Sequence, residues 1–139
     1  MSDESPARRP RRKLLLVEDS SPVQEILGNV LRIVPGLELV AVVDTAAEAL
    51  AAFELHRPEF VILDLVLRAG RGLDVLQAIK LRAPACRVLV FTGYDAEPYR
   101  SRCLAAGADD FFSKNMQHQD LIRRPQPDIG TDTVRRHSR

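Results

Sequence analysis

The sequence predicts an α/β protein with a doubly wound (βα)5 architecture, a three-layer sandwich in which helices cover both faces of a parallel five-stranded sheet. Five short apolar segments of strand length alternate with helical segments along the chain, which is the element order of such folds. The strand segments are continuous apolar runs, as expected for strands that are covered on both faces. A length of 139 residues with 45% hydrophobic and 28% charged residues fits one globular domain.

The first predicted strand, residues 13–19 (KLLLVED), is followed by a predicted helix over residues 21–34. Apolar side chains recur on one face of that helix: Val23, Ile26, Leu27, Val30, Leu31 and Val34. Three residues are expected to start the helix, as N-cap, first helical position and capping-box partner: Ser21, Pro22 and Gln24. Pro35 and Gly36 are expected to end it.

The later elements continue the same alternation. Further strands are predicted at residues 37–43, 59–64, 86–92 and 109–113. Helices are predicted at residues 46–56, 72–82 and 96–106, with a short last helix over residues 117–124. Thr45 and Glu48 form a capping box before the second helix, and Gly107 is the expected C-terminal cap of the fourth.

Both ends of the chain are basic, although the net charge is only +1. Residues 1–12 are rich in serine, proline and arginine and are predicted to form a disordered tail. Residues 13–124 are predicted to form the domain, and residues 125–139 an irregular tail. Because no aromatic residues are interleaved with the basic ones, we interpret the tails as solvated and expect no direct nucleic-acid binding.

The cysteines and the apolar runs predict a cytoplasmic location. Cys86 and Cys103 are not closely spaced and are expected to be reduced thiols in the core. No apolar run reaches the length of a membrane span, and the first residues lack the apolar segment of a secretory signal. No membrane contact is therefore expected.

Polar residues gather where four of the predicted strands end. They are, in chain order, Glu18, Asp19, Asp64, Thr92, Gly93 and Lys114. Because the carboxyl ends of parallel strands share one edge of a sheet, these residues are expected to converge in a shallow pocket. The alternatives are a turn cap at Asp64, solvated carboxylates at residues 18 and 19, and a surface lysine at position 114.

This set of residue types favours phosphoryl transfer. Neighbouring carboxylates repel unless a cation is present, and Mg²⁺ accepts one or two carboxylates together with phosphate oxygens. Lys114 supplies a compact positive charge for a phosphoryl oxygen, Thr92 supplies a hydrogen bond, and Gly93 leaves room for a ligand. Asp64 is the candidate nucleophile, which would form an acyl phosphate.

Four segments in order, LLLVEDS, VILDLVLRAGRGLDVL, VLVFTG and AGADDFFSK, resemble the receiver (CheY-like) domain of bacterial two-component response regulators over residues 13–123. The resemblance implies a sheet in the order 2-1-3-4-5 and a phosphorylation-dependent signalling switch. It implies that Asp64 accepts a phosphoryl group from a sensor histidine kinase or a histidine phosphotransfer protein, with Mg²⁺ as cofactor. It also implies self-phosphorylation and slow self-dephosphorylation, without the turnover of an enzyme.

The resemblance assigns a metal site and a switch. The implied metal site consists of Glu18, Asp19, Asp64 and the backbone carbonyl of Val66. Asp19 resembles the direct ligand, whereas Glu18 helps to hold the metal, often through water. Thr92 and Lys114 resemble the phosphoryl-binding switch pair, and Phe111 stands at the position of the rotating aromatic residue. Phe112, which points to the opposite face, is the alternative buried aromatic.

Val66, Gly93 and Tyr94 are expected to control access to the phosphoryl group. Val66 and Tyr94 lie two residues beyond Asp64 and Thr92, so the resemblance places them beside the acyl phosphate. An apolar and a bulky side chain there should hinder the hydrolytic water. We therefore expect a slow decay of the phosphorylated form.

Three departures from the family pattern change the expectations. Asn115 stands where the family usually has a proline after the switch lysine, and Arg68 occupies a position that is often proline. The loop of residues 68–72 is expected to be mobile and able to meet an acidic partner. Pro125 shortens the last helix, which weakens the expectation of a dimer, so we expect a monomer or weak dimer.

Two other functions compete with the switch. A phosphatase of the haloacid dehalogenase type also uses an aspartate at a strand end, but it needs a second aspartate where this chain has Val66. A phosphate-independent receiver-like interaction module is the alternative that Asn115 and the short last helix suggest. No output domain is recognisable after Asp120, so a stand-alone switch with a protein target is expected, although the chain could also be one domain of a longer protein.

Overall fold

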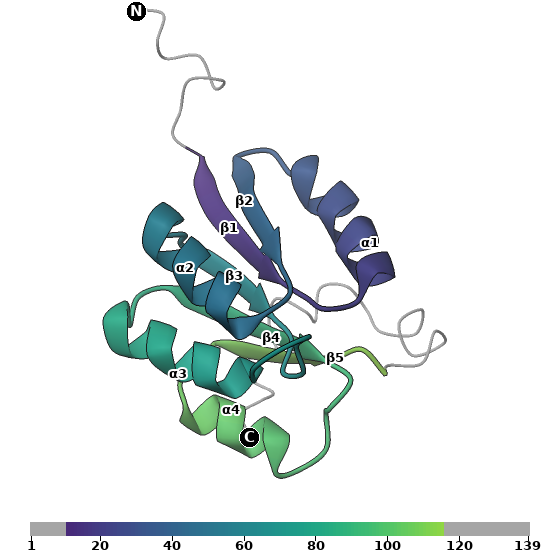
Figure 1. Cartoon of the computed structure of the whole chain (residues 1–139), viewed down its shortest axis with the longest axis vertical. Coiled ribbons are helices and arrows are strands. Elements are labelled where there is room, and N and C mark those ends of the chain that lie inside the picture. Colours follow the sequence, from purple (N-terminus) through teal and green to yellow (C-terminus); the bar gives the residue numbers. More distant parts are fainter. Residues whose placement is uncertain (1–10, 116–139) are drawn as a thin grey trace, which may run out of the picture.

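A computed structural model describes residues 11–115 of the chain. Within this range, five parallel strands and four helices alternate along the chain. The strands are β1 (Arg12–Val17), β2 (Leu37–Val43), β3 (Phe60–Leu63), β4 (Arg87–Thr92) and β5 (Asp110–Ser113). The helices are α1 (Ser21–Arg32), α2 (Ala46–His56), α3 (Gly72–Arg82) and α4 (Tyr99–Ala105). The strand order β2-β1-β3-β4-β5 confirms the predicted doubly wound fold (Figure 1).

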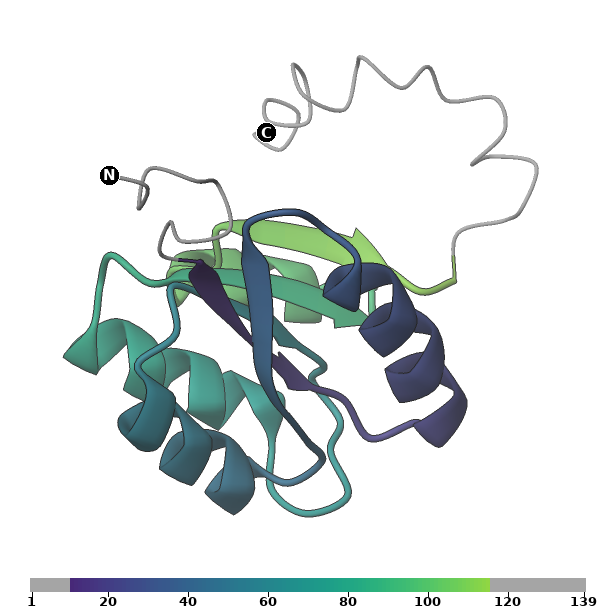
Figure 2. The ribbon, with the colours of Figure 1, turned by 90° about the horizontal axis from the view of Figure 1, so that it is seen from above.

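The two faces of the sheet are covered unequally. The helices α2, α3 and α4 lie along one face, and α1 lies on the other (Figures 1 and 2). Val88 and Val90 of β4 are fully buried, whereas Leu89 and Phe91, which alternate with them, are half-buried. Within residues 11–115, helices therefore lie on both faces of the sheet as predicted, but α1 covers its face only in part. The helix predicted over residues 117–124, residues 1–10 of the predicted N-terminal tail and the whole predicted C-terminal tail lie outside the described residues.

The apolar side of α1 is less buried than its periodicity predicts. Ile26 is 64% exposed and Val30 is 52% exposed. A groove of about 450 Å³ lies between α1 and the half-covered face of the sheet, with Leu27, Leu89 and Phe91 among its lining residues.

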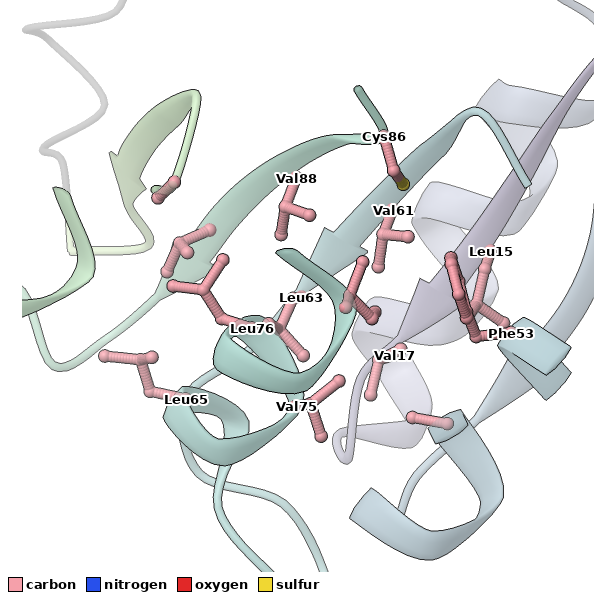
Figure 3. Packing of buried hydrophobic residues seen from close by; sticks show 14 of the residues in the cluster. Leu15, Val17, Phe53, Val61, Leu63, Leu65, Val75, Leu76, Cys86 and Val88 are labelled. Carbon is pink, nitrogen blue, oxygen red and sulfur yellow. The ribbon is translucent and has the colours of Figure 1, made fainter. Parts of the chain in front are cut away.

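The hydrophobic core lies between the sheet and the helices α2 and α3 (Figure 3). The strands contribute Leu15, Val17, Val61, Leu63, Val88 and Val90, and the helices contribute Phe53, Val75, Leu76 and Ile79. Burial of each such side chain contributes about 1.5–3 kcal/mol. Cys86 and Cys103 belong to this cluster as free thiols, and burial raises the pKa of both to about 11. The prediction of cysteines in the core is confirmed.

The helix boundaries have local causes. The Thr45 hydroxyl accepts from the Glu48 N–H at 3.1 Å, as predicted for the start of α2. Helix α4 begins at Tyr99, three residues later than predicted. A residue before proline is disfavoured in the helical region, and Glu97 precedes Pro98. No helix within residues 11–115 is long and apolar enough to cross a lipid bilayer.

An ion pair joins the end of α3 to the N-terminal ends of β4 and β5. Lys80 Nζ donates to Asp109 Oδ2 at 2.8 Å and to the Cys86 carbonyl at 2.6 Å. Asp109 Oδ2 also accepts from the Val88 N–H at 2.7 Å. Gly107 follows α4 with a φ of +104°, and a Cβ there would lie 3.2 Å from Lys80 Cγ. Side-chain contacts therefore fix this end of the sheet, opposite to the carboxyl ends of the strands.

Candidate functional site

Four neighbouring strands bring the candidate residues to one edge of the sheet. Glu18 directly follows β1, Asp64 follows β3, Thr92 ends β4, and Lys114 follows β5. The strands are parallel and paired in sequence order from β3 to β5, with β1 beside β3. Their carboxyl ends therefore lie side by side. Side chains up to 96 residues apart in the sequence make direct contact there.

Lys114 lies between two carboxylates. Its Nζ atom donates to Glu18 Oε2 and to Asp64 Oδ2, at 2.8 Å in each case. The Glu18 side chain is 1% exposed and the Asp64 side chain is 9% exposed. Burial lowers the pKa of Lys114, but the hydrogen bonds and charges of Asp64 and Glu18 outweigh this and raise it above its usual value. One ammonium group is thus shared by two buried carboxylates.

Asp64 is held in one orientation by its surroundings. Its Oδ1 atom accepts from the Leu65 N–H at 2.7 Å, while Oδ2 faces Lys114. The start of α3 approaches closely, since a Cβ on Gly72 would lie 2.0 Å from the Asp64 carbonyl oxygen. Glycine is therefore required at position 72. The site presents a carboxylate whose two oxygens have different partners.

Glu18 carries a charge that the fold disfavours. Burial raises the pKa of Glu18, hydrogen bonds from Lys114 and the Ser20 N–H partly offset this, and the charge of Asp64 raises it further. The Ser20 N–H donates to Glu18 Oε2 at 3.0 Å. The carboxylate is thus oriented by its contacts and still lacks full charge compensation.

The capping residues at the start of α1 differ from the predicted ones, and one of the predicted residues instead contacts the backbone of Glu18. Ser20, and not Ser21, is the N-cap, and its hydroxyl accepts from the Val23 N–H at 3.4 Å. Gln24 does not close a capping box, because its Nε2 atom donates to the Glu18 carbonyl oxygen at 2.6 Å. The glutamine therefore supports the backbone of the residue that faces Lys114.

The Glu18→Gln variant is expected to gain stability relative to the parent chain as the pH rises above 4.5. The folded state binds the Glu18 proton more tightly than the unfolded state, because the folded pKa is raised from its usual value of 4.5. The free energy of unfolding of the parent therefore falls as the pH rises from 4.5 through the folded pKa, and the glutamine variant avoids this loss. Urea denaturation of both chains between about pH 4 and pH 8 measures the difference. A difference that stays constant over this range would contradict the prediction.

The implied metal ligands are only partly assembled. Asp19 is exposed, and the part of the chain that the structure describes contains no group of three or more His, Cys, Asp or Glu side chains that could hold a metal ion. Val66 is 43% exposed, with its N–H 3.5 Å from Asp64 Oδ1. The donor chemistry nevertheless fits a hard cation, since Glu18 and Asp64 offer carboxylate oxygens that share one ammonium group.

Thr92 is fully buried beside the site. Its hydroxyl oxygen accepts from the Tyr94 N–H at 3.2 Å. The Tyr94 side chain is 50% exposed, and its ring packs edge-on against Tyr99 of α4 with centroids 5.6 Å apart. Val66 and Tyr94 are thus both accessible to solvent from the loops that follow Asp64 and Thr92.

Phe111 is the buried aromatic residue of β5. It is 9% exposed, and the guanidinium of Arg100 in α4 lies 5.3 Å from its ring centroid. Phe112 is 41% exposed, so the alternative that Phe112 is the buried one is wrong. Successive strand residues point to opposite faces, and only the face with Phe111 is covered by α4.

Residues of the loop before α3 make contacts within the chain, whereas residues 68–72 were predicted to form a mobile loop that could meet an acidic partner. Arg68 binds Asp44 through two nitrogens at 2.9 and 3.3 Å, and its N–H donates to the Asp44 carbonyl at 2.9 Å. The hydrogen bond from Arg68 lowers the pKa of Asp44. A Cβ on Gly70 would lie 2.4 Å from Ala46 Cβ, at a φ of +87° that favours glycine. The acidic partner of the arginine therefore lies within the chain.

Sequence reasoning missed the polar contacts on either side of Lys114. Asn115 Nδ2 donates to the Gly93 carbonyl at 2.7 Å, and the Ser113 hydroxyl donates to Asp95. The sequence signal for these contacts is a hydrogen-bonding side chain on each side of the lysine, which the absence of the family's usual proline at position 115 does not reveal.

The model of one protein family, described as "Response regulator receiver domain", matches residues 14–126 of the chain. The photosynthetic apparatus regulatory protein RegA of Cereibacter sphaeroides is 35% identical over 106 residues, which are 74% of this chain and 55% of RegA. The DNA-binding transcriptional activator DevR/DosR of Mycobacterium tuberculosis is 30% identical over 111 residues, which are 80% of this chain and 51% of the activator. The chain spans about half the length of these curated relatives.

Solved structures show the same fold. A CheY-like receiver domain protein from Methanospirillum hungatei superposes with a TM-score of 0.70 at 22% identity, over 90% of this chain and 98% of that one. The Mn(2+)-bound form of response regulator Rcp1 gives a TM-score of 0.70 at 23% identity, over 92% and 96% of the two chains. The family match covers residues 14–126, the strand order agrees with it, and the chain belongs to the response regulator receiver domain family.

Proposed function

We propose that the domain is a phosphorylation-dependent signalling switch in which Asp64 accepts a phosphoryl group from a sensor histidine kinase or a histidine phosphotransfer protein. The observation that carries the proposal is the position of Lys114 Nζ, 2.8 Å from both Glu18 Oε2 and Asp64 Oδ2. An ammonium beside a carboxylate nucleophile can compensate the charge of an incoming phosphoryl group. Membership of the receiver family supports the same chemistry.

The proposed step is a transfer from nitrogen to oxygen. An Asp64 carboxylate oxygen forms a bond to phosphorus while the P–N bond of the donor phosphohistidine breaks, and the electron pair returns to the imidazole nitrogen. Lys114 exchanges a carboxylate oxygen for a phosphoryl oxygen and keeps a charge-assisted hydrogen bond. The step therefore needs little rearrangement of the amine.

The residues that would hold Mg²⁺ are Glu18, Asp19, Asp64 and the carbonyl of Val66. When bound, the ion supplies positive charge that neutralises phosphoryl and carboxylate oxygens. The carboxylate oxygens of Glu18 and Asp64, which both contact Lys114, support this assignment, and the similar response regulator Rcp1 has a Mn(2+)-bound form. The exposure of Asp19 allows its carboxylate to join the site when a cation is present.

The proposed signal passes from Thr92 to α4. The Thr92 hydroxyl moves toward the phosphoryl group, and Phe111 moves into the vacated space. Phe111 has no hydroxyl group and is already only 9% exposed, so its movement depends on repacking of the ring, and any further apolar burial contributes only about 25 cal/mol per Å². Arg100 of α4 lies over the Phe111 ring, so a movement of the ring changes a contact of that helix.

The experiment that tests the switch is phosphorylation with a small phosphodonor. The chain is incubated with the donor and Mg²⁺, and its intact mass is then measured. A gain of one phosphoryl group that requires the metal is expected. No gain in a folded chain would refute the switch and favour the phosphate-independent interaction module, which Asn115 in place of the usual proline suggests.

The proposed output is a contact with a protein target. We propose a cytoplasmic domain, a monomer or weak dimer, whose phosphorylated form binds that target without direct nucleic-acid contact. Its only proposed chemistry is its own phosphorylation and slow dephosphorylation, so it is not expected to hydrolyse phosphate monoesters. A pull-down with and without an acyl-phosphate analogue would identify the target.

The double variant Val66→Asn with Tyr94→Ala is expected to lose its phosphoryl group about tenfold faster than the parent, a barrier lower by ~1.4 kcal/mol. The parent side chains are 43% and 50% exposed, so they lie where water must pass. Asparagine at position 66 can orient the hydrolytic water by a hydrogen bond, and alanine at position 94 leaves more space for it. The decay of the phosphorylated mass with time measures the rate. The control Leu81→Ala, at an 84% exposed position in α3, is expected to decay like the parent, and an unchanged rate in the double variant would sink the idea.

A further inference from the structure

A set of polar contacts joins the loop after β4 to the end of β5. Asn115 Nδ2 donates to the Gly93 carbonyl oxygen at 2.7 Å, and the Ser113 hydroxyl donates to Asp95 Oδ2. The Asn115 N–H donates to the Ser113 hydroxyl oxygen at 2.9 Å, which links the two side chains. We name Gly93, Asp95, Ser113 and Asn115 the β4–β5 clasp.

The clasp contacts Thr92 through a single peptide unit. The Gly93 carbonyl and the Tyr94 N–H belong to one trans peptide, which is planar, so that the two groups point in opposite directions. The carbonyl accepts from Asn115, and the N–H donates to the Thr92 hydroxyl oxygen at 3.2 Å. The side chain of Asn115 therefore orients the group that holds the Thr92 hydroxyl.

The same contacts fix the segment that carries Lys114. The Lys114 N–H donates to the Thr92 carbonyl at 2.9 Å, which continues the pairing of β4 and β5 beyond their last ladder pair. Clasp residues flank Lys114 on both sides. The ammonium and the hydroxyl are thus positioned by contacts across the same two strand ends.

We propose that Asn115 is a positioning residue, which holds the Thr92 hydroxyl at the Tyr94 N–H in the unphosphorylated domain and releases it when the hydroxyl moves to a phosphoryl group on Asp64. The release rests on the proposed function, whereas the positioning does not. The net contribution of one neutral hydrogen bond is modest, and a bond to a charged phosphoryl oxygen is stronger. The contact is therefore strong enough to orient a peptide and weak enough to open.

Amide hydrogen exchange at Tyr94 in the full, unphosphorylated chain tests the positioning. Asn115→Asp keeps the size of the side chain but removes the donor, and Asn115→Ala removes the side chain without adding charge. Both are expected to speed exchange at Tyr94 about three- to tenfold, while core amides of β3 and β4 keep their rates. Asn115→Gln retains the donor and is expected to restore protection. The control Asn29→Asp, at an exposed position of α1, is expected to match the parent, and parent-like exchange at Tyr94 in both donor-free variants overturns the positioning role.

Beryllofluoride, an analogue of the phosphoryl group, tests the release. In the parent, its binding with Mg²⁺ is expected to speed exchange at Tyr94, and the change is expected to be smaller in Asn115→Ala, where the contact is already absent. Binding that leaves Tyr94 fully protected in the parent overturns the release. Binding of beryllofluoride is monitored by fluorine NMR. Absence of binding would count against the proposed function and would leave the positioning result unaffected.

Discussion

The Asp64→Asn variant is expected to show no phosphoryl mass gain under conditions that phosphorylate the parent chain. The asparagine oxygen still accepts from the Leu65 N–H, as the carboxylate does at 2.7 Å, but a neutral amide does not form an acyl phosphate. A loss of at least about a thousandfold in rate is expected, equivalent to ~4 kcal/mol in the barrier. Intact-mass spectrometry at matched times measures it.

The control for this prediction is Asp74→Asn. Asp74 is exposed on α3 and is paired with Arg71 at 3.2 Å, so the substitution removes an aspartate close to Asp64 in the sequence without changing a site contact. It is expected to gain mass at the parent rate. If the Asp64 variant still gained mass as the parent does, the assignment of Asp64 as acceptor would fail.

Substitution of Lys114 by methionine is expected to change two measurements in opposite directions. Without the ammonium, Glu18 and Asp64 lose a hydrogen bond at 2.8 Å each, and the remaining carboxylates repel more strongly. Mg²⁺ should therefore bind about tenfold more tightly, ~1.4 kcal/mol, as measured by titration calorimetry. Phosphorylation should be about a hundredfold slower, because the phosphoryl group loses its cationic partner.

Lys13→Met is the matched control for Lys114. Lys13 is an exposed residue of β1, at the opposite end of that strand from Glu18. Its loss changes the net charge equally and is expected to leave both measurements at parental values. Weaker binding of Mg²⁺ by the Lys114 variant would show that the amine supports the cation site and does not compete with it.

The strand-end residues could be predicted because their positions depend on only two regularities. Parallel strands place their carboxyl ends together, and each apolar run marked where its strand ended. Glu18, Asp64 and Lys114 were found in this way and do make contact. The exposed position of Asp19 could not be predicted, since adjacent residues after a strand turn in directions that depend on the loop.

Side-chain partners that are distant in the sequence were harder to predict. The composition of residues 68–72 indicated a mobile loop, but Arg68 binds Asp44, which lies 24 positions away. At α1, two adjacent serines could both cap the helix, and the chain uses Ser20. Gln24 had several possible backbone partners there and binds the Glu18 carbonyl. A distant contact decided the outcome for Arg68, whereas at α1 the choice lay among neighbouring groups that the local sequence left equal.

The ion pair of Lys80 and Asp109 has a consequence for how the domain can signal. It anchors the ends of β4 and β5 that lie farthest from Asp64, through bonds to Cys86 and Val88. The opposite ends are joined by the hydrogen bonds of the clasp. The two strands are thus fixed at their N-terminal ends and can adjust at their carboxyl ends. A partner that contacts the carboxyl ends can distinguish two states of the domain while the core stays packed.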